Sequence, residues 1–215
     1  MSEAPIQPEQ IRNFIAEHLL VAPVAALPEI RLHQAQPTSG LSRLRAMGAS
    51  SDIPFWAFTW AGGLALARHV LTHPDLVANR RVLDFGSGSG LVAIAAAKAG
   101  AALVTAIDID PAAIVAAELN AAANDVNIVS MLGDATNAET PDADLILAGD
   151  VFYDRDLAKR VLPFLQRCIA AGVDVLIGDP NRAPLPRRRL RLIAHYDTGD
   201  VGDAALSSSY VYALR

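Results

Sequence analysis

The chain has one cysteine among its 215 residues, Cys168, so it cannot form an internal disulfide. Proteins without disulfides are typical of reducing compartments, and we expect a cytoplasmic protein. Cys168 falls in an apolar row at helical spacing, which favours a buried, unreactive thiol over a nucleophile. The scarcity of cysteine therefore excludes a disulfide-stabilised scaffold.

Long apolar runs are missing as well. No stretch of about 18 apolar residues is present, so we expect no transmembrane helix and no membrane partner. Residues 19–27 are apolar, but the residues before them include Glu3, Glu9 and Glu17 against a single arginine, Arg12. That charge pattern is a poor match to a signal or transit peptide.

Basic residues are in deficit: 18 Lys and Arg face 23 Asp and Glu, and the formal net charge is −5. This balance argues against a duplex nucleic-acid binder that relies on phosphate contacts. It fits a monomer that meets a basic protein surface. Hydrophobic residues make up 52% of the chain and charged residues 19%, which indicates a packed globular enzyme rather than a disordered protein.

The length fits a single domain, residues 1–215. Within it we expect a helical and aromatic extension over residues 1–79 that covers the ligand site, followed by an α/β core over 80–215. In the extension, amphipathic spacing predicts a helix over 7–20, and residues 22–51 read as an irregular connection interrupted by prolines. A second helical pattern covers 64–71. Four of the twelve aromatic residues lie between positions 55 and 60, either covering a sheet edge or lining a pocket.

From residue 80 the chain alternates strand and helix patterns, which predicts a mostly parallel sheet with helices on both faces, a Rossmann-like α/β fold. We expect strands over 81–86, 103–108, 127–132, 144–149 and 173–178, and helices over 90–99, 111–124 and 154–171. Pro163 predicts a kink or break in the last helix. Two late strand patterns, 190–196 and 208–214, predict an antiparallel C-terminal hairpin and bring the sheet to seven strands.

A glycine loop joins the first strand of this core to its helix. Gly86, Gly88 and Gly90 alternate in the sequence DFGSGSGL, where a sharp backbone turn and close ligand approach need residues without a Cβ. The helix start that follows offers unpaired N–H groups. The dinucleotide fingerprint requires a glycine where this chain has Leu91, so the match to an NAD site is incomplete.

Acidic residues at three strand ends make the loop more informative. Asp84 precedes the first glycine by two residues and is placed to bind a cationic amino group, while Asp108 is spaced to accept both ribose hydroxyls. Asp134 follows the third strand and is a candidate for the adenine amino group. Ile109 and Ala135, which directly follow two of these acids, are assigned to the same cofactor site. Each aspartate taken alone is equally well explained by a turn or helix cap.

This arrangement resembles the class I, or seven-β-strand, S-adenosylmethionine-dependent methyltransferases, and the resemblance covers residues 80–180. It implies S-adenosylmethionine as the cofactor and a sheet that ends in an antiparallel hairpin. The segment after the fourth strand reads Asp150-Val-Phe-Tyr153 and lacks the prolines of the motif that adenine and glutamine methyltransferases carry there. An Asp-x-x-Tyr motif at this point is similar to the seven-strand protein lysine methyltransferases.

Two further segments narrow the resemblance to the electron transfer flavoprotein β subunit lysine methyltransferases. They are WAFTWAGG at 56–63 and GDPNR at 178–182, in which Ala61 and Asn181 depart from the residues that the family often carries. The resemblance implies that Asp150 orients the substrate amine, that Tyr153 shapes its channel and that Trp60 contacts the methionine part of the cofactor. A helix cap remains the alternative for Asp150, and packing for the two aromatic residues.

Other functions stay open at this point: a methyltransferase of another protein or a small-molecule amine, a nucleotide-binding oxidoreductase, or a non-catalytic cofactor-binding protein. Arg182 and Arg187–Arg189 form the main basic cluster, which we expect to be a solvated face. The five histidines show no metal-ligand pattern, and we expect no metal.

Overall fold

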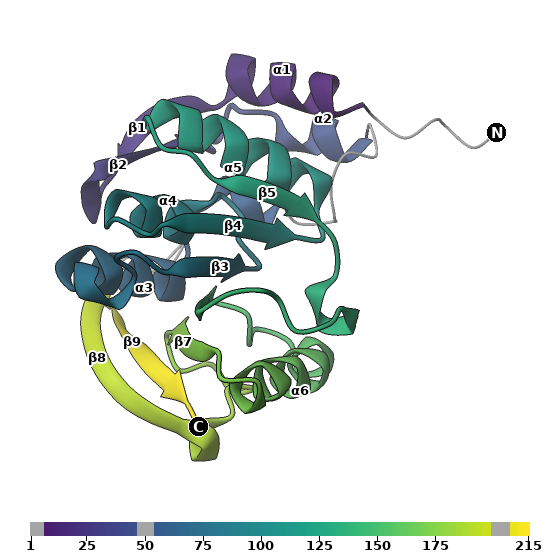
Figure 1. Cartoon of the computed structure of the whole chain (residues 1–215). Coiled ribbons are helices and arrows are strands. Elements are labelled where there is room, and N and C mark those ends of the chain that lie inside the picture. Colours follow the sequence, from purple (N-terminus) through teal and green to yellow (C-terminus); the bar gives the residue numbers. More distant parts are fainter. Residues whose placement is uncertain (1–6, 47–53, 199–206) are drawn as a thin grey trace.

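The fold is built around a seven-stranded sheet with the strand order β5-β4-β3-β6-β7-β9-β8 (Figure 1). The computed structural model describes residues 7–46, 54–198 and 207–215. The strands are β3 (Arg81–Phe85), β4 (Leu103–Asp108), β5 (Val129–Leu132), β6 (Leu145–Gly149), β7 (Asp174–Asp179), β8 (Leu190–Thr198) and β9 (Ser207–Leu214). Strands β3 to β7 pair in parallel, whereas β9 is antiparallel to both β7 and β8. The predicted sheet and its C-terminal hairpin are confirmed.

Successive side chains of each strand point to opposite faces of the sheet, and each face packs into its own hydrophobic core. Val82 of β3 packs on one face with helices α3 (Ala61–Thr72), α4 (Leu91–Lys98) and α5 (Pro111–Ala123). Its neighbour Leu83 packs on the other face with α6 (Arg155–Ala170), where Cys168 is buried as expected. Helices thus cover both faces, and the carboxyl ends of the parallel strands lie at one edge of the sheet.

The N-terminal region contains more regular structure than its sequence indicates. Helix α1 (Pro8–His18) is followed by an antiparallel pair, β1 (Leu20–Val24) and β2 (Leu27–Gln34), then α2 (Leu41–Ala46). We expected an irregular connection over 22–51 because prolines interrupt the pattern, and that prediction was wrong for the strands and for α2. Residues 35–40 are irregular, and 47–51 lie outside the described residues. In a two-stranded ribbon both strands are edges, so Pro23 and Pro28 cost few ladder hydrogen bonds, and both residues are exposed.

Helix α6 runs unbroken through Pro163, where a kink or a break was expected. Pro163 lies on the exposed side of the helix, where water can satisfy the carbonyl group that its missing N–H leaves open. The remaining elements are short 3₁₀ turns: η1 (Phe55–Ala57), η2 (Pro74–Leu76), η3 (Ala135–Asn137) and η4 (Arg187–Arg189). In the part of the chain that the structure describes, no helix has the length and apolar character to cross a membrane.

Candidate functional site

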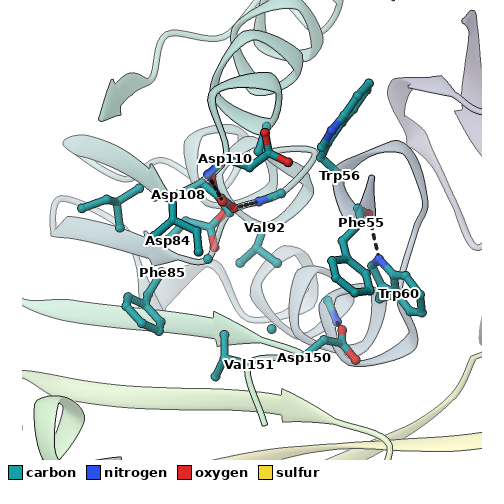
Figure 2. A pocket seen from close by; sticks show the side chains of 18 of the residues that line it. Phe55, Trp56, Trp60, Asp84, Phe85, Val92, Asp108, Asp110, Asp150 and Val151 are labelled. Atoms are coloured by element: carbon teal, nitrogen blue, oxygen red, sulfur yellow. Dashed lines mark hydrogen bonds between the residues drawn. The ribbon is translucent and has the colours of Figure 1, made fainter. Parts of the chain in front are cut away.

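A cavity of about 430 Å³ opens at the carboxyl ends of the parallel strands (Figure 2). Its wall combines the glycine loop, the residues that follow β4, β5 and β6, and an aromatic segment around η1. Ten of the predicted site residues line it: Trp60, Asp84, Gly86, Gly88, Asp108, Ile109, Asp134, Ala135, Asp150 and Tyr153. Segments far apart in the sequence therefore meet at one concave surface, and its size is typical of a small-molecule site.

Gly90 is the predicted residue that the structure places elsewhere. It is the residue before α4, with φ at +78°, and its backbone packs against α5. A Cβ at Gly90 would lie 3.0 Å from the Cβ of Ala117. Close packing between two helices, rather than contact with a ligand, explains this glycine.

The glycine loop is held in place by the carboxylate at the end of β4. Gly86 and Gly88 have φ angles of +68° and +51°, a region that favours glycine. The Gly88 N–H donates to Asp108 Oδ2 at 2.8 Å, and the Asp110 N–H donates to Oδ1 at 2.9 Å. Burial is the main cause that raises the pKa of Asp108, and the hydrogen bonds from the backbone oppose it. The carboxylate lines the cavity and can still accept a hydroxyl donor from a ligand there.

Asp84 is buried at the end of β3, with only 2% of its surface exposed. Its Oδ2 accepts the N–H of Ala93 in the first turn of α4 at 2.9 Å. Burial raises the pKa of Asp84 to about 7, and the nearby Asp108 adds to the rise. A cationic ligand group in the cavity would favour the ionised carboxylate, because an opposite charge stabilises that form.

The carboxylate of Asp134 already accepts hydrogen bonds from other groups of the chain. Its Oδ1 accepts the backbone N–H and the hydroxyl of Thr136, and its Oδ2 accepts Asn137 Nδ2 and Arg160 Nη1, all within 2.9 Å. Hydrogen bonding to the Thr136 side chain is the main cause that lowers its pKa. All four acceptor positions of the carboxylate are taken, so an adenine contact through this side chain would displace one of these donors. In this structure the side chain of Asp134 therefore acts as a helix cap.

Asp150 sits in a left-handed conformation, φ +57°, directly after β6. Its two oxygens accept the backbone N–H groups of Gly62 and Gly63 in the first turn of α3, and Arg182 forms an ion pair with Oδ1. Burial is the first cause that raises the pKa of Asp150, and the Arg182 charge acts against it. Asp150 therefore caps a helix and borders the cavity at the same time, so the two interpretations of its role are compatible.

Arg182 does not belong to a solvated basic face, as the sequence led us to expect. Its side chain is only 20% exposed and lines the cavity, whereas Arg187, Arg188 and Arg189 are exposed. The error arose because the four arginines are close in sequence, while the turn after β7 directs Arg182 toward a buried carboxylate. The motif GDPNR at 178–182 was the available signal.

Three aromatic rings form part of the wall of the cavity. The ring of Phe55 lies 5.3 Å from that of Tyr153 and 5.6 Å from that of Trp60, measured between centroids. The Trp60 Nε1–H donates to the Phe55 carbonyl oxygen at 2.8 Å, which links the two residues (Figure 2). Trp56 also borders the cavity, but its side chain is buried in the core with α1 and α5. The aromatic segment thus serves both interpretations, packing through Trp56 and lining the cavity through Phe55 and Trp60.

Comparison with known proteins identifies the family. Residues 69–151 match the family model described as ribosomal protein L11 methyltransferase (PrmA). The electron transfer flavoprotein β subunit lysine methyltransferase of Danio rerio is 40% identical over 199 residues, which cover 89% of this chain and 77% of that one. The chain belongs to this lysine methyltransferase family. The Homo sapiens relative of the same name is 41% identical over 176 residues, covering 80% and 67% of the two chains.

A solved structure shows the same fold. The ribosomal protein L11 methylase of Lactobacillus delbrueckii subsp. bulgaricus superposes with a TM-score of 0.51 at 24% identity, over 70% of this chain and 77% of that one. The chain is accordingly a class I methyltransferase whose methyl donor is S-adenosylmethionine.

The residues of the cavity fit that cofactor. The glycine loop has positive φ angles at Gly86, Gly88 and Gly90, and at the first two its backbone is open to close approach by a ligand. Asp108 presents a carboxylate to the ribose hydroxyls, and Asp84 offers a buried carboxyl group to a cationic amino group. The aromatic and apolar residues of the wall provide a surface on which an adenine ring and a methionine chain can pack.

Proposed function

We propose that this enzyme transfers the methyl group of S-adenosylmethionine to a lysine side chain of the β subunit of electron transfer flavoprotein. The names of relatives that are about 40% identical over most of the chain support this substrate. The observation in the structure that carries the proposal is the charge of the cavity. Five aspartates and two arginines line it, a surplus of acid that suits the entry of a cationic side chain.

In this proposal the cofactor lies between the glycine loop and the aromatic segment. Asp108 binds the ribose hydroxyls, Asp84 binds the amino group, and the backbone at Gly86 and Gly88 allows close approach. Trp60 packs on the methionine part. Ile109, which is 64% exposed, and Ala135 flank the adenine ring, so that apolar contact replaces a hydrogen bond from the adenine amino group to Asp134.

S-adenosylmethionine supplies an electrophilic methyl group on a sulfonium, which an amine takes by in-line displacement. A lysine ammonium, whose unperturbed pKa is about 10.4, would first release a proton to water. Its nitrogen would then take the methyl group as the carbon–sulfur bond breaks, and S-adenosylhomocysteine would leave. Asp150 holds the substrate nitrogen at the cavity by accepting an N–H on its oxygen Oδ2. The adjacent rings of Tyr153 and Phe55 form one apolar surface along which the alkyl chain packs. Holding the nitrogen in line is the main contribution of the protein.

The test is methyl transfer with purified components. The enzyme is incubated with methyl-labelled S-adenosylmethionine and either electron transfer flavoprotein or ribosomal protein L11, the substrate named for the family model that matches residues 69–151. We expect label on a lysine of the flavoprotein β subunit and none on L11. Label on L11 alone would support the second substrate, and label on neither would contradict both.

A further inference from the structure

Arg182 connects two carboxylates that are largely shielded from water. Its Nη1 forms an ion pair with Asp150 Oδ1 and lies 3.6 Å from Oδ2 of Asp179, which is fully buried. Its backbone N–H donates to Asp179 Oδ1 at 2.7 Å, which fixes the turn after β7. A single guanidinium therefore compensates both acids, and its removal would leave them without a cation.

Asp150 connects the turn after β7 to the start of α3. The Gly62 N–H donates to its Oδ1 at 3.1 Å, and the Gly63 N–H donates to its Oδ2 at 2.5 Å. The helix start and the end of β7 are in direct backbone contact, because a Cβ at Gly62 would lie 2.3 Å from the carbonyl oxygen of Gly178. Trp60, the residue directly before α3, lines the cavity. The contacts that hold the start of α3 therefore also position this part of the cavity wall.

The count of acceptor positions shows what the ion pair does for Asp150. Oδ1 accepts from Gly62 and from Arg182, which uses both of its positions. Oδ2 accepts from Gly63 and keeps one position. Arg182 thus determines which oxygen of the carboxylate is offered to a ligand in the cavity.

We propose that Arg182 is a positioning residue for methyl transfer, which acts by holding Asp150 with Oδ2 toward the incoming amine. This inference rests on the proposed function, because it needs an amine acceptor. The charged groups that face Asp150 are Arg182 and, behind it, Asp179, while α3 faces it with backbone amides. Without Arg182 the carboxylate loses its neighbouring cation, and its pKa rises further above the ordinary value.

The test compares Arg182→Gln and Arg182→Lys with Arg188→Gln, a control that makes the same change at an exposed arginine. We expect Arg182→Gln to lower kcat about 100-fold, the size of effect that a misplaced reacting group produces. The KM for S-adenosylmethionine stays within about twofold of wild type, and Arg182→Lys recovers part of the loss because it keeps the charge. A purely structural loss would be as large in Arg182→Lys as in Arg182→Gln and would also weaken S-adenosylmethionine binding. A wild-type kcat in Arg182→Gln, or a loss in Arg182→Lys as large as that in Arg182→Gln, would overturn the proposal.

A second measurement separates this proposal from the choice of substrate. The carboxyl ¹³C signal of Asp150, assigned with Asp150→Asn, is titrated by NMR without any acceptor. We expect Asp150 to titrate at higher pH in Arg182→Gln than in wild type and in Arg188→Gln. If the flavoprotein receives no methyl group but this shift occurs, the substrate is wrong and the control of Asp150 by Arg182 stands. An unshifted titration contradicts the role of Arg182, whatever the substrate.

Discussion

Gly88 and Asp108 are 20 residues apart in sequence, and the Gly88 N–H donates to the Asp108 carboxylate at 2.8 Å. One side chain therefore shapes the glycine loop and, in our proposal, binds the ribose of the cofactor. This double role explains why the acid belongs at the end of β4, next to the loop in the sheet. In this proposal, a small change at Asp108 alters both the loop and the ribose contact.

Replacing Asp108 with Asn is expected to weaken S-adenosylmethionine binding about 10- to 100-fold. The amide has one acceptor oxygen, and its NH₂ group would face either the Gly88 or the Asp110 N–H, so a charge-assisted hydrogen bond is lost. Titration calorimetry measures the affinity, with the exposed Asp75→Asn as control. Equal affinity in Asp108→Asn and wild type would remove Asp108 from the cofactor site, and tighter binding of NAD than of S-adenosylmethionine would contradict the cofactor itself.

Replacing two glycines that have similar φ angles distinguishes the energetic cost of backbone strain from the cost of close packing. Gly90 and Gly100 have φ angles of +78° and +91°, but a Cβ at Gly90 meets Ala117 at 3.0 Å, whereas one at Gly100 meets nothing within 4 Å. We expect Gly100→Ala to lower the free energy of unfolding by about 1 kcal/mol. Gly90→Ala should cost a further 1–3 kcal/mol, roughly the penalty of overpacking. Urea denaturation measures both, and equal losses would show that the contact with α5 is unimportant.

The buried carboxyl group of Asp84 predicts a pH-dependent stability. Its pKa of about 7 in the folded chain lies above the ordinary value of 3.8, so between these values the folded state holds a proton that the unfolded state has released. The contribution of Asp84 is therefore greatest below pH 4 and declines as the pH rises toward 7. Asp84→Asn removes this titration and keeps an oxygen for the Ala93 N–H.

The measurement is the difference in unfolding free energy between Asp84→Asn and wild type, followed from pH 4 to pH 7 by chemical denaturation. We expect the variant to gain on wild type as the pH rises. Asp75→Asn, an exposed change of the same kind, should track wild type throughout. A difference for Asp84→Asn that is constant across the range would mean that this group does not titrate there.

Tyr153 allows the ring and the hydroxyl to be tested separately. The residue is 50% exposed, and its ring lies beside that of Phe55 at the cavity. If the ring guides the acceptor chain, Tyr153→Phe keeps kcat/KM for the protein substrate within about threefold, while Tyr153→Ala lowers it more than about tenfold. Calorimetry should show unchanged S-adenosylmethionine affinity in both. A large loss in Tyr153→Phe would assign the role to the hydroxyl instead.

The parts of the site that the sequence predicted are those where local pattern and strand ends coincide. Gly86, Asp84 and Asp108 all lie at the ends of well-patterned strands, and parallel strands bring their carboxyl ends to one edge. Gly90 was assigned to the ligand for the same reason, although its conformation serves the packing of α4 on α5. A glycine pattern shows that the backbone is unusual without showing what approaches it.

Other features depend on contacts between residues that are far apart in sequence. The pairing of Arg182 with Asp150 spans 32 positions. The motif GDPNR sets Arg182 apart from the exposed arginines that follow, but it does not show which carboxylate the side chain meets. The β1–β2 pair was missed because prolines are penalised in central strands but are tolerated in a two-stranded ribbon. One of the donors to Asp134 is Arg160 on α6, which is 26 residues away in the sequence.

Transfer of a labelled methyl group to the β subunit of electron transfer flavoprotein tests the central claim most directly. The purified complex is incubated with S-adenosylmethionine that carries a deuterated methyl group, with wild-type enzyme or with Asp150→Ala, and the β subunit is mapped by mass spectrometry. We predict heavy methyl groups on lysine with the wild-type enzyme. We predict almost none with the variant, whose cofactor affinity by calorimetry remains close to wild type. An unlabelled β subunit after incubation with wild-type enzyme that binds S-adenosylmethionine would contradict the proposed substrate, and near wild-type labelling by Asp150→Ala would contradict the assigned role of Asp150.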